Sequence, residues 1–177
     1  MSVPEALTAI LTLGDAYGLQ LHAELGARLP HRSKTNVGQI YSTLERLVRD
    51  GLVERSGETQ DGLPLYAATA AGATRAKYWL AGNAIDSGAS WTEILDVVLL
   101  GSTLAPVPLT QACDHIESIS WTPTADDSLS KRASLHFESA VRALISDVRQ
   151  AQSNGTLPVR GLDHERPVRG RRPQTNN

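Results

Sequence analysis

The sequence predicts a mainly α-helical protein with an N-terminal winged helix-turn-helix domain, a two-stranded wing and an α-helical C-terminal domain. Apolar residues make up 41% of the 177 residues and aromatic residues only 5%, so the core is expected to consist of Leu, Val, Ile and Ala, which favours helices. Over residues 1–51, apolar side chains recur at helical spacing in three segments. A stretch rich in turn-forming residues, SGETQDGLP, then separates two short strand-like segments.

The first three helices are expected over residues 2–13, 17–29 and 35–50. Ser2 and Glu5 have the spacing of a capping box at the start of the first helix. The second helix is expected to bury four leucines: Leu19, Leu21, Leu25 and Leu29. The third helix has apolar residues at helical spacing throughout: Val37, Ile40, Tyr41, Leu44, Leu47 and Val48.

A β-hairpin is expected after the third helix, with strands near residues 52–55 and 65–68 and a turn at Asp61-Gly62. A fourth helix begins at Thr69. This order of three helices, a hairpin and a helix is typical of a winged helix, and we assign residues 1–82 to this domain.

Residues 83–154 are expected to form a second, helical domain. Ser90 and Glu93 form another capping box before a helix that is apolar on nearly every side. Further helices are expected over 109–119 and 126–150, the last with an amphipathic stripe: Leu129, Ala133, Phe137, Ala140, Val141, Leu144 and Val148. Residues 155–177 are basic, rich in proline and without periodicity, and are expected to be a disordered tail.

The third helix is predicted to read DNA. With its apolar face on the core, its polar residues point outward: Thr35, Asn36, Gln39, Ser42, Thr43 and Arg46. Asn and Gln can pair with adenine, Arg with guanine, and Thr can touch the thymine methyl group in the major groove. Arg32 and Lys34, with His31, are expected near phosphates, and Arg55 in the wing at residues 55–65 is expected to approach the adjacent backbone.

The alternative for this helix is a polar face that meets only solvent, but the order of elements favours DNA binding. The net charge of −2 does not exclude it, because the acidity lies elsewhere. Residues 1–80 carry net charge 0 (8 basic, 8 acidic), residues 81–154 carry −5 (4 and 9), and residues 155–177 carry +3 (5 and 2). The tail arginines are expected either to add weak affinity for any DNA or to have no role: Arg160, Arg166, Arg169, Arg171 and Arg172.

The segment VGQIYSTLERLVRDGLVE, with AYGLQLHAEL before it and LYAATAAG after it, resembles the PadR family of winged-helix transcription regulators. Its Tyr17-Gly18 pair, the pattern from Gly38 to Leu52, Tyr66 and the Thr69-x-x-Gly72 helix start match the family over about residues 3–80. The resemblance implies a repressor-like homodimer whose two wings grip a pseudo-palindromic operator. It also implies that Tyr17 and Tyr41 donate to phosphates, whereas the alternative for Tyr41 is a core aromatic with a solvated hydroxyl.

The resemblance further implies that the C-terminal helices form a dimerisation domain. The expected interface residues are Trp91, Leu95, Leu99, Phe137, Val141, Leu144 and Val148. Regulators of this kind can bind small aromatic effectors, for which the candidates are Trp79, Trp91 and Trp121. The segment around 105–125 departs from the family's simpler C-terminal domain.

No motif indicates an enzyme, a cofactor or a metal site. Cys113, Asp114 and His115 are adjacent, but consecutive helical residues point in different directions and no second pair has ligand spacing. One Cys and an N-terminus without a basic leader or a membrane-length apolar run lead us to expect a soluble cytoplasmic protein. The remaining functional alternatives are a protein-interaction module without DNA contact and a regulator controlled by a small effector.

Overall fold

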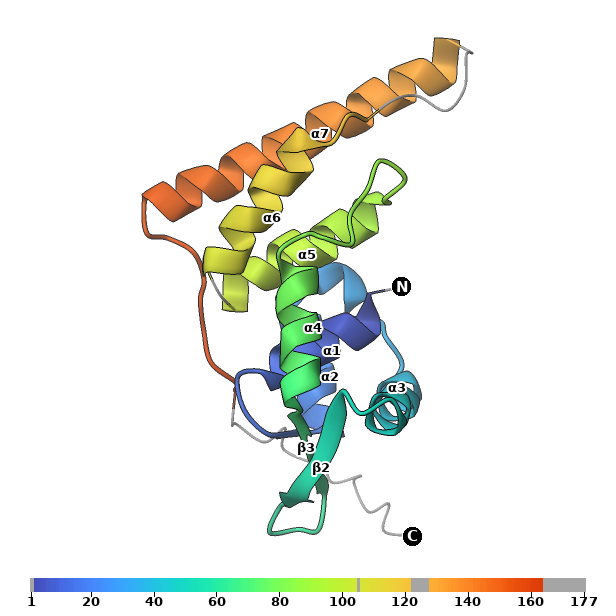
Figure 1. The fold of residues 1–177 in the computed structure, drawn as a ribbon, viewed down its shortest axis with the longest axis vertical. Coiled ribbons are helices and arrows are strands. Elements are labelled where there is room, and N and C mark those ends of the chain that lie inside the picture. Colours follow the sequence, from blue (N-terminus) through green and yellow to red (C-terminus); the bar gives the residue numbers. More distant parts are fainter. Residues whose placement is uncertain (1, 105, 122–127, 164–177) are drawn as a thin grey trace, which may run out of the picture.

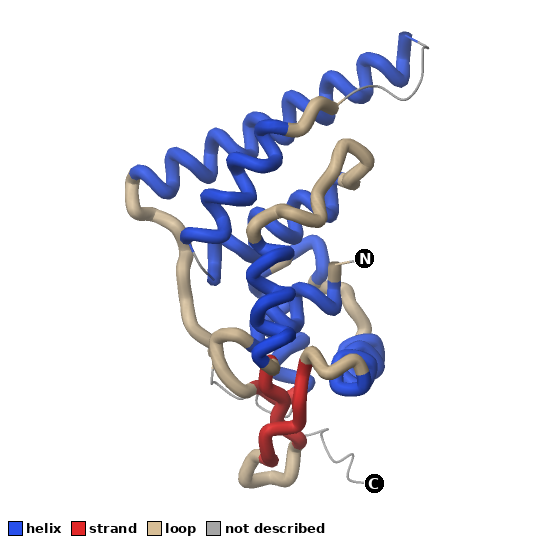
Figure 2. Tube along the Cα trace, viewed as in Figure 1, coloured by secondary structure: helices blue, strands red, loops and turns tan. Residues whose placement is uncertain are grey.

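The computed structural model describes residues 2–104, 106–121 and 128–163 (Figure 1). The N-terminal part contains, in chain order, α1 (Val3–Leu11), β1 (Ala16–Tyr17), α2 (Gly18–Arg28), the short 3-10 helix η1 (Pro30–Arg32), α3 (Val37–Arg49), β2 (Val53–Glu58), β3 (Pro64–Ala68) and α4 (Ala70–Leu80). The C-terminal helices are α5 (Trp91–Leu104), α6 (Pro106–Ser118) and α7 (Ser128–Ser153). The mainly helical fold with a winged helix at its N-terminal end is confirmed (Figure 2).

The wing is the antiparallel hairpin of β2 and β3, and β1 adds a third strand, in the order β1-β3-β2. Tyr17 lies in β1 and pairs with Leu65 of β3, so the second helix, expected to begin at about residue 17 or 18, begins at Gly18. The β2–β3 register is irregular between Arg55 and Gly57, and Gly62 has a φ of +72° in the turn, a conformation that favours glycine. In the whole molecule, the wing projects from the end that also carries α3 (Figure 1).

The core of the N-terminal part joins α1, α2, α3 and α4 through apolar side chains that are almost fully buried, among them Leu7, Ile10, Leu25, Ile40 and Leu44. One expectation is wrong: Leu19 is 41% exposed. Leu21, Leu25 and Leu29 are fully buried as expected, and the buried surface of α2 extends to the polar residues Gln20, Glu24 and Arg28.

The two expected capping boxes have different outcomes. The Ser90 hydroxyl and amide both donate to Glu93 Oε2 at 2.9 Å, and the Glu93 amide donates to Ser90 Oγ, which confirms the second box. Ser2 is the N-cap residue of α1, but its side chain makes no capping hydrogen bond. Its hydroxyl donates to Asp96 in α5 instead.

The C-terminal helices form a layer on the side opposite the wing (Figure 1). α5 is buried on nearly every side, as expected from its sequence, and α7 packs on α5 and α6 through Val141, Ile145 and Val148. The first turns of α7 extend beyond the helices beneath them (Figure 1), and Leu129 and Leu135 are exposed there.

After α7 the chain returns to the N-terminal part (Figure 1). Residues 155–163, which were expected to be disordered, lie against the core through Leu157 and Leu162 and are hydrogen-bonded to α2. We call residues 156–163 the strap. The other tail residues, 164–177, lie outside the described part of the chain.

Candidate nucleic-acid interface

The start of α3 is fixed by two residues that the sequence had assigned to base reading. Asn36 is the N-cap, and its Oδ1 accepts a hydrogen bond from the Gly38 amide at 2.7 Å. Thr35 lies in the preceding turn, where its hydroxyl donates to the Arg32 carbonyl at 2.7 Å and its own carbonyl contacts the His22 ring. The helix thus begins at Val37, and these two side chains shape its start.

Three of the predicted reading residues lie together on the exposed face of α3. Gln39, Ser42 and Arg46 are exposed at successive turns, and the Ser42 hydroxyl donates to the Gln39 carbonyl at 3.1 Å. Thr43, in contrast, is only 5% exposed, so the expectation that it points outward is wrong. Thr43 lies about one helical turn from the buried residues Ile40 and Leu47, on the same side of the helix.

A groove with a volume of about 420 Å³ runs along this face of α3. Gln39, Ser42 and Arg46 line one side, and residues at the starts of α1 and α5, including Ser2 and Glu93, line the other. The exposed polar face of α3 therefore borders the C-terminal helices as well as solvent.

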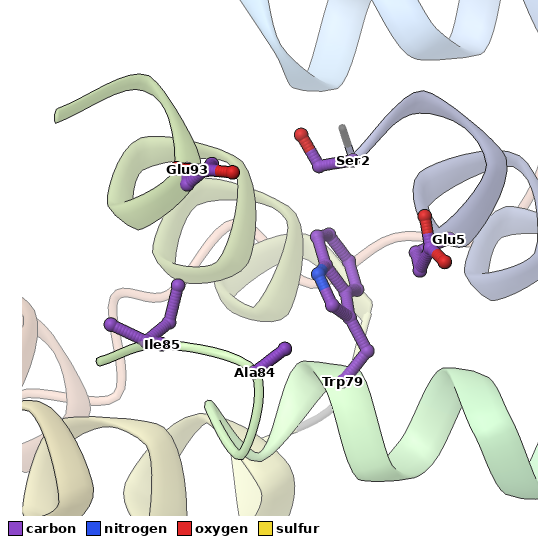
Figure 3. A pocket seen from close by; sticks show the side chains of 6 residues that line it. All are labelled: Ser2, Glu5, Trp79, Ala84, Ile85 and Glu93. Atoms are coloured by element: carbon purple, nitrogen blue, oxygen red, sulfur yellow. The ribbon is translucent and has the colours of Figure 1, made fainter. Parts of the chain in front are cut away.

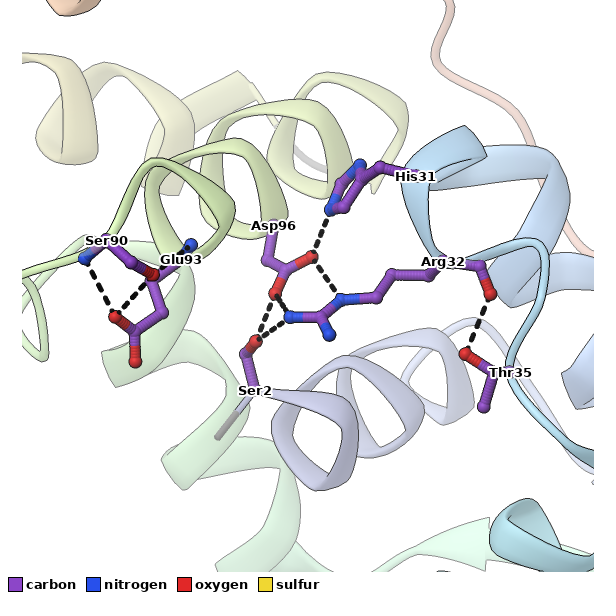
Figure 4. A network of polar contacts seen from close by, with 7 residues as sticks. All are labelled: Ser2, His31, Arg32, Thr35, Ser90, Glu93 and Asp96. Atoms are coloured by element: carbon purple, nitrogen blue, oxygen red, sulfur yellow. Dashed lines mark hydrogen bonds and ion pairs between the residues drawn. The ribbon is translucent and has the colours of Figure 1, made fainter. Parts of the chain in front are cut away.

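Arg32 and His31, expected near phosphates, are bound to the buried Asp96 (Figure 4). Arg32 Nη2 lies 2.6 Å from Asp96 Oδ2, and His31 Nε2 lies 2.7 Å from Oδ1. The hydrogen bond to Asp96 raises the pKa of Arg32. Asp96 is 1% exposed, and a buried carboxylate requires such partners. An Asp in the middle of an otherwise apolar helix was the sequence signal for this cluster.

Tyr41 and Tyr17 flank the first turn of α2. A Cβ added at Gly18 would lie 2.5 Å from a ring carbon of Tyr41, so the ring packs directly on the helix backbone. Burial raises the pKa of Tyr41. Both tyrosines remain half-buried, with Tyr17 in β1. Gly18 and Tyr41, which belong to separate parts of the motif that carries the family resemblance, are therefore in direct contact.

The other predicted contacts to phosphates are solvent-exposed: Lys34 before α3 and Arg55 on β2. Arg49, on the last turn of α3, was not predicted and is also exposed; its position one turn after Arg46 was the signal. Across residues 33–62, which include α3 and most of the wing, there are four basic residues and five acidic ones, all exposed. The surface predicted to read DNA therefore carries no excess of positive charge.

The three tryptophans do not line one site. Trp79 lines a cavity of about 220 Å³ with Ser2, Glu5, Ala84, Ile85 and Glu93 (Figure 3). Neither Trp91 nor Trp121 is among its lining residues. Both instead contact the Phe137 ring edge-on, with ring centroids 6.3 and 5.2 Å away, so they belong to an aromatic cluster under α7.

Two residues of the expected dimer interface, Val141 and Val148, are buried within the single chain. The others retain exposed surface: Trp91, Leu95, Leu99, Phe137 and Leu144.

The adjacent Cys113, Asp114 and His115 point to different partners. Cys113 is buried, which raises the pKa of its thiol to about 11, Asp114 pairs with Arg149, and His115 contacts the Ile85 carbonyl. In the described part of the chain, no three His, Cys, Asp or Glu side chains are grouped as a metal site would require. None of the helices that the structure describes has the length and apolarity needed to cross a membrane.

A three-helix unit, a wing and an exposed polar face on the third helix define a winged helix-turn-helix protein of the kind that regulates transcription. Residues 7–78 match the model of the transcriptional regulator PadR-like family, which confirms the resemblance found in the sequence. No curated protein sequence matches the chain.

Proposed function

We propose that the protein is a homodimeric repressor that reads a pseudo-palindromic operator with α3 and the wing. The observation that supports this most directly is the division of α3 into two faces. Ile40 and Leu44 are fully buried, while Gln39, Ser42 and Arg46 are exposed at successive turns. Amide and guanidinium groups on an exposed helix are suited to base edges in the major groove.

The division of labour follows from the positions of the side chains. Gln39 and Arg46 would contact base edges, and Lys34, Arg55 and the hydroxyl of Tyr17 would contact phosphates. In this proposal Arg32 acts by holding the turn before α3 against α5, since its guanidinium is bound to Asp96.

We also propose that dimerisation uses the C-terminal helices, as the family resemblance implies. The partly exposed apolar residues of α5 and α7, including Leu95, Leu99 and Leu144, together with the exposed Leu129 and Leu135, supply the surface. A small aromatic effector stays a prediction of the resemblance; of its three candidate residues, Trp79 lines the cavity described above, while Trp91 and Trp121 contact Phe137.

Single substitutions on α3 test the reading face. Gln39→Ala and Arg46→Ala should each weaken binding to the protein's own upstream DNA by about 1–3 kcal/mol and relax the preference at particular base pairs. Lys34→Ala should weaken binding to upstream and scrambled duplexes alike and make the salt dependence shallower. The measurement is fluorescence anisotropy of labelled duplexes over a salt series.

Gln111→Ala on α6 and Arg142→Ala on α7 are matched controls, because both side chains are exposed and far along the chain from α3. If Gln39→Ala and Arg46→Ala bind upstream DNA as these controls do, the reading helix is assigned wrongly. If the unchanged protein binds neither duplex at low salt, the proposal fails, and salt-insensitive association with a protein would favour an interaction module.

A further inference from the structure

α5 has two buried polar side chains that are bonded to different parts of the winged helix. Asp96 is 1% exposed and Thr103 is 7% exposed. Thr103 follows Asp96 by seven positions, close to two helical turns, so both lie on one side of α5, about 10 Å apart along its axis. The winged helix is therefore held to α5 at two separate points.

The first point is the Asp96 carboxylate. It accepts hydrogen bonds from Ser2 at the start of α1 and from Arg32 in η1 (Figure 4). His31, also in η1, lies 2.7 Å from the same carboxylate. Only residues 33–36 separate η1 from α3, so this point fixes α5 to the turn in front of α3.

The second point is Arg28, in the last turn of α2, which is 3% exposed. Its Nη1 donates to the hydroxyl and the carbonyl of Thr103, at 3.0 and 3.1 Å. Its Nη2 donates to the carbonyls of Arg160 and Gly161 in the strap, at 3.2 and 2.7 Å, and its Nε donates to Glu24 at 2.7 Å. One planar guanidinium thus joins α2, the end of α5 and the strap, and its fork specifies orientation as well as distance.

The contribution of these two points is direction. Buried charged groups add little net stability over apolar residues of similar size, because the cost of removing them from water offsets much of their attraction. Apolar packing between two layers is also non-directional, whereas hydrogen bonds to carboxylate and main-chain atoms require a particular geometry. Two such points on one helix prevent rotation about either of them, so the winged helix and α5 are joined as one unit.

This unit includes part of the proposed dimer interface, because Leu95 and Leu99 lie on α5 and keep exposed surface. In the proposed dimer, each α3 is therefore connected to the interface through a single helix that is held at two points. A dimer that reads two half-sites needs its reading helices at a matching distance, about 34–36 Å for one turn of DNA. The fold thus sets the distance between the two α3 helices.

We propose that Asp96 and Arg28 select the spacing between the two half-sites of the operator, because they fix each α3 relative to the dimer interface. Both are positioning residues, since neither touches DNA in the proposed function. The proposal rests on that function and deepens it: α3 selects the sequence of a half-site, and the two buried groups select how far apart the half-sites lie.

The first test measures the distance between the two α3 helices without DNA. Glu45→Cys, at an exposed position of α3, carries a nitroxide label, while the native Cys113 is fully buried and protected from it. Pulsed double electron–electron resonance should give one narrow distance distribution for the labelled dimer. Arg28→Lys keeps a positive charge beside Glu24 but lacks the planar fork, so it should broaden the distribution. Arg142→Lys, at an exposed site on α7, is the matched control and should leave it narrow.

The second test measures affinity for the operator that footprinting of the upstream DNA defines. Each base pair inserted between the half-sites moves them apart by about 3.4 Å and rotates them by about 35°. The unchanged protein should bind about 10²–10⁴-fold more weakly at wrong spacings, because only one half-site stays engaged, and Arg28→Lys should lose less than about tenfold. The readout is the ratio of the affinities at the native and a wrong spacing, because a general loss of folded protein leaves that ratio unchanged.

Two further variants keep the test independent of the folding of Arg28→Lys, and circular dichroism verifies the fold of each. Thr103→Val removes the hydroxyl acceptor and leaves the carbonyl bond to Arg28, so its affinity ratio should lie between those of the unchanged protein and Arg28→Lys. Asp96→Asn tests the first point and should also lower the ratio. Asp147→Asn, at an exposed site on α7, is its control.

The outcomes separate the two proposals. A narrow distribution and an unchanged affinity ratio in all variants would overturn the role of the two points, and so would a broad distribution in the unchanged protein. In either case, specific binding of upstream DNA would still support the proposed function. Absence of dipolar coupling between the labels would overturn the proposed dimer and this inference together. Failure of the unchanged protein to bind any duplex would overturn both proposals.

Discussion

The backbone at Gly18 and the ring of Tyr41 approach each other so closely that no other residue fits at position 18 without a shift. An added Cβ would lie 2.5 Å from the ring, well inside van der Waals contact. The contact therefore sets the distance between α2 and α3, the two helices of the helix-turn-helix.

Gly18→Ala should lower the free energy of unfolding by about 1–3 kcal/mol, because overpacking forces the ring or the helix to shift. Urea denaturation followed by circular dichroism measures this change. Gly26→Ala is the control on the same helix, since its added Cβ meets its nearest atom at an ordinary 3.5 Å. That variant should gain up to about 1 kcal/mol from helix propensity. Equal effects of the two substitutions would contradict the close contact.

At the scale of an element, the capping box of Ser90 and Glu93 stabilises the start of α5. The hydrogen bonds from the Ser90 amide and hydroxyl lower the pKa of Glu93 below its ordinary value of 4.5. A carboxyl group whose pKa is lower in the folded state adds stability above its unfolded pKa, and this stability is lost as the pH falls through the folded value. The cap thus stabilises α5 at neutral pH and weakens in acid.

Glu93→Gln should reduce the free energy of unfolding at pH 7, and the difference from the unchanged protein should shrink below about pH 4.5, the ordinary pKa of a Glu side chain. Ser90→Ala should cost about 1 kcal/mol at pH 7, a typical value for removal of an N-cap side chain. Thermal or urea unfolding over a pH series from neutral to acid provides the measurement. A Glu93→Gln difference that stays constant throughout the series would rule out the ionised cap.

The same Ser-x-x-Glu pattern occurs at Ser2 and Glu5, but there it does not form a capping box, which shows what the sequence could not predict. Helices and the second capping box depend on residues within one or two turns, and the sequence predicted them well. Ser2 has a competing acceptor in Asp96, 94 residues later, and no local pattern indicates that contact. The buried polar residues of α2, Gln20, Glu24 and Arg28, were missed for the same reason, since their partners in the strap lie more than 130 residues away.

At the scale of the whole molecule, Asp96 connects three segments: the start of α1, the turn η1 before α3, and α5. Ser2, His31 and Arg32 all converge on its carboxylate (Figure 4). The position of α3, the proposed reading helix, is therefore linked to the C-terminal helices through one buried carboxylate.

Asp96→Asn should lower the free energy of unfolding by about 3 kcal/mol, because it leaves the Arg32 guanidinium without its counter-charge. It should also speed amide hydrogen exchange in η1 and the first turn of α3. Asp147→Asn, at an exposed site on α7, is the matched control. Equal stability and exchange in the two variants would show that the cluster does not couple the parts.

The strap also determines how this protein can be divided. The elements of the winged helix follow one another in sequence from α1 to the end of α4 at Leu80, yet part of their buried surface contacts residues 156–163. A fragment that ended near Gly82 would leave the buried Glu24 and Arg28 without the main-chain partners that the strap provides. A chimera that exchanges the C-terminal helices for those of another regulator would have to retain the strap, so the unit that evolution or an engineer can transplant is a discontinuous one.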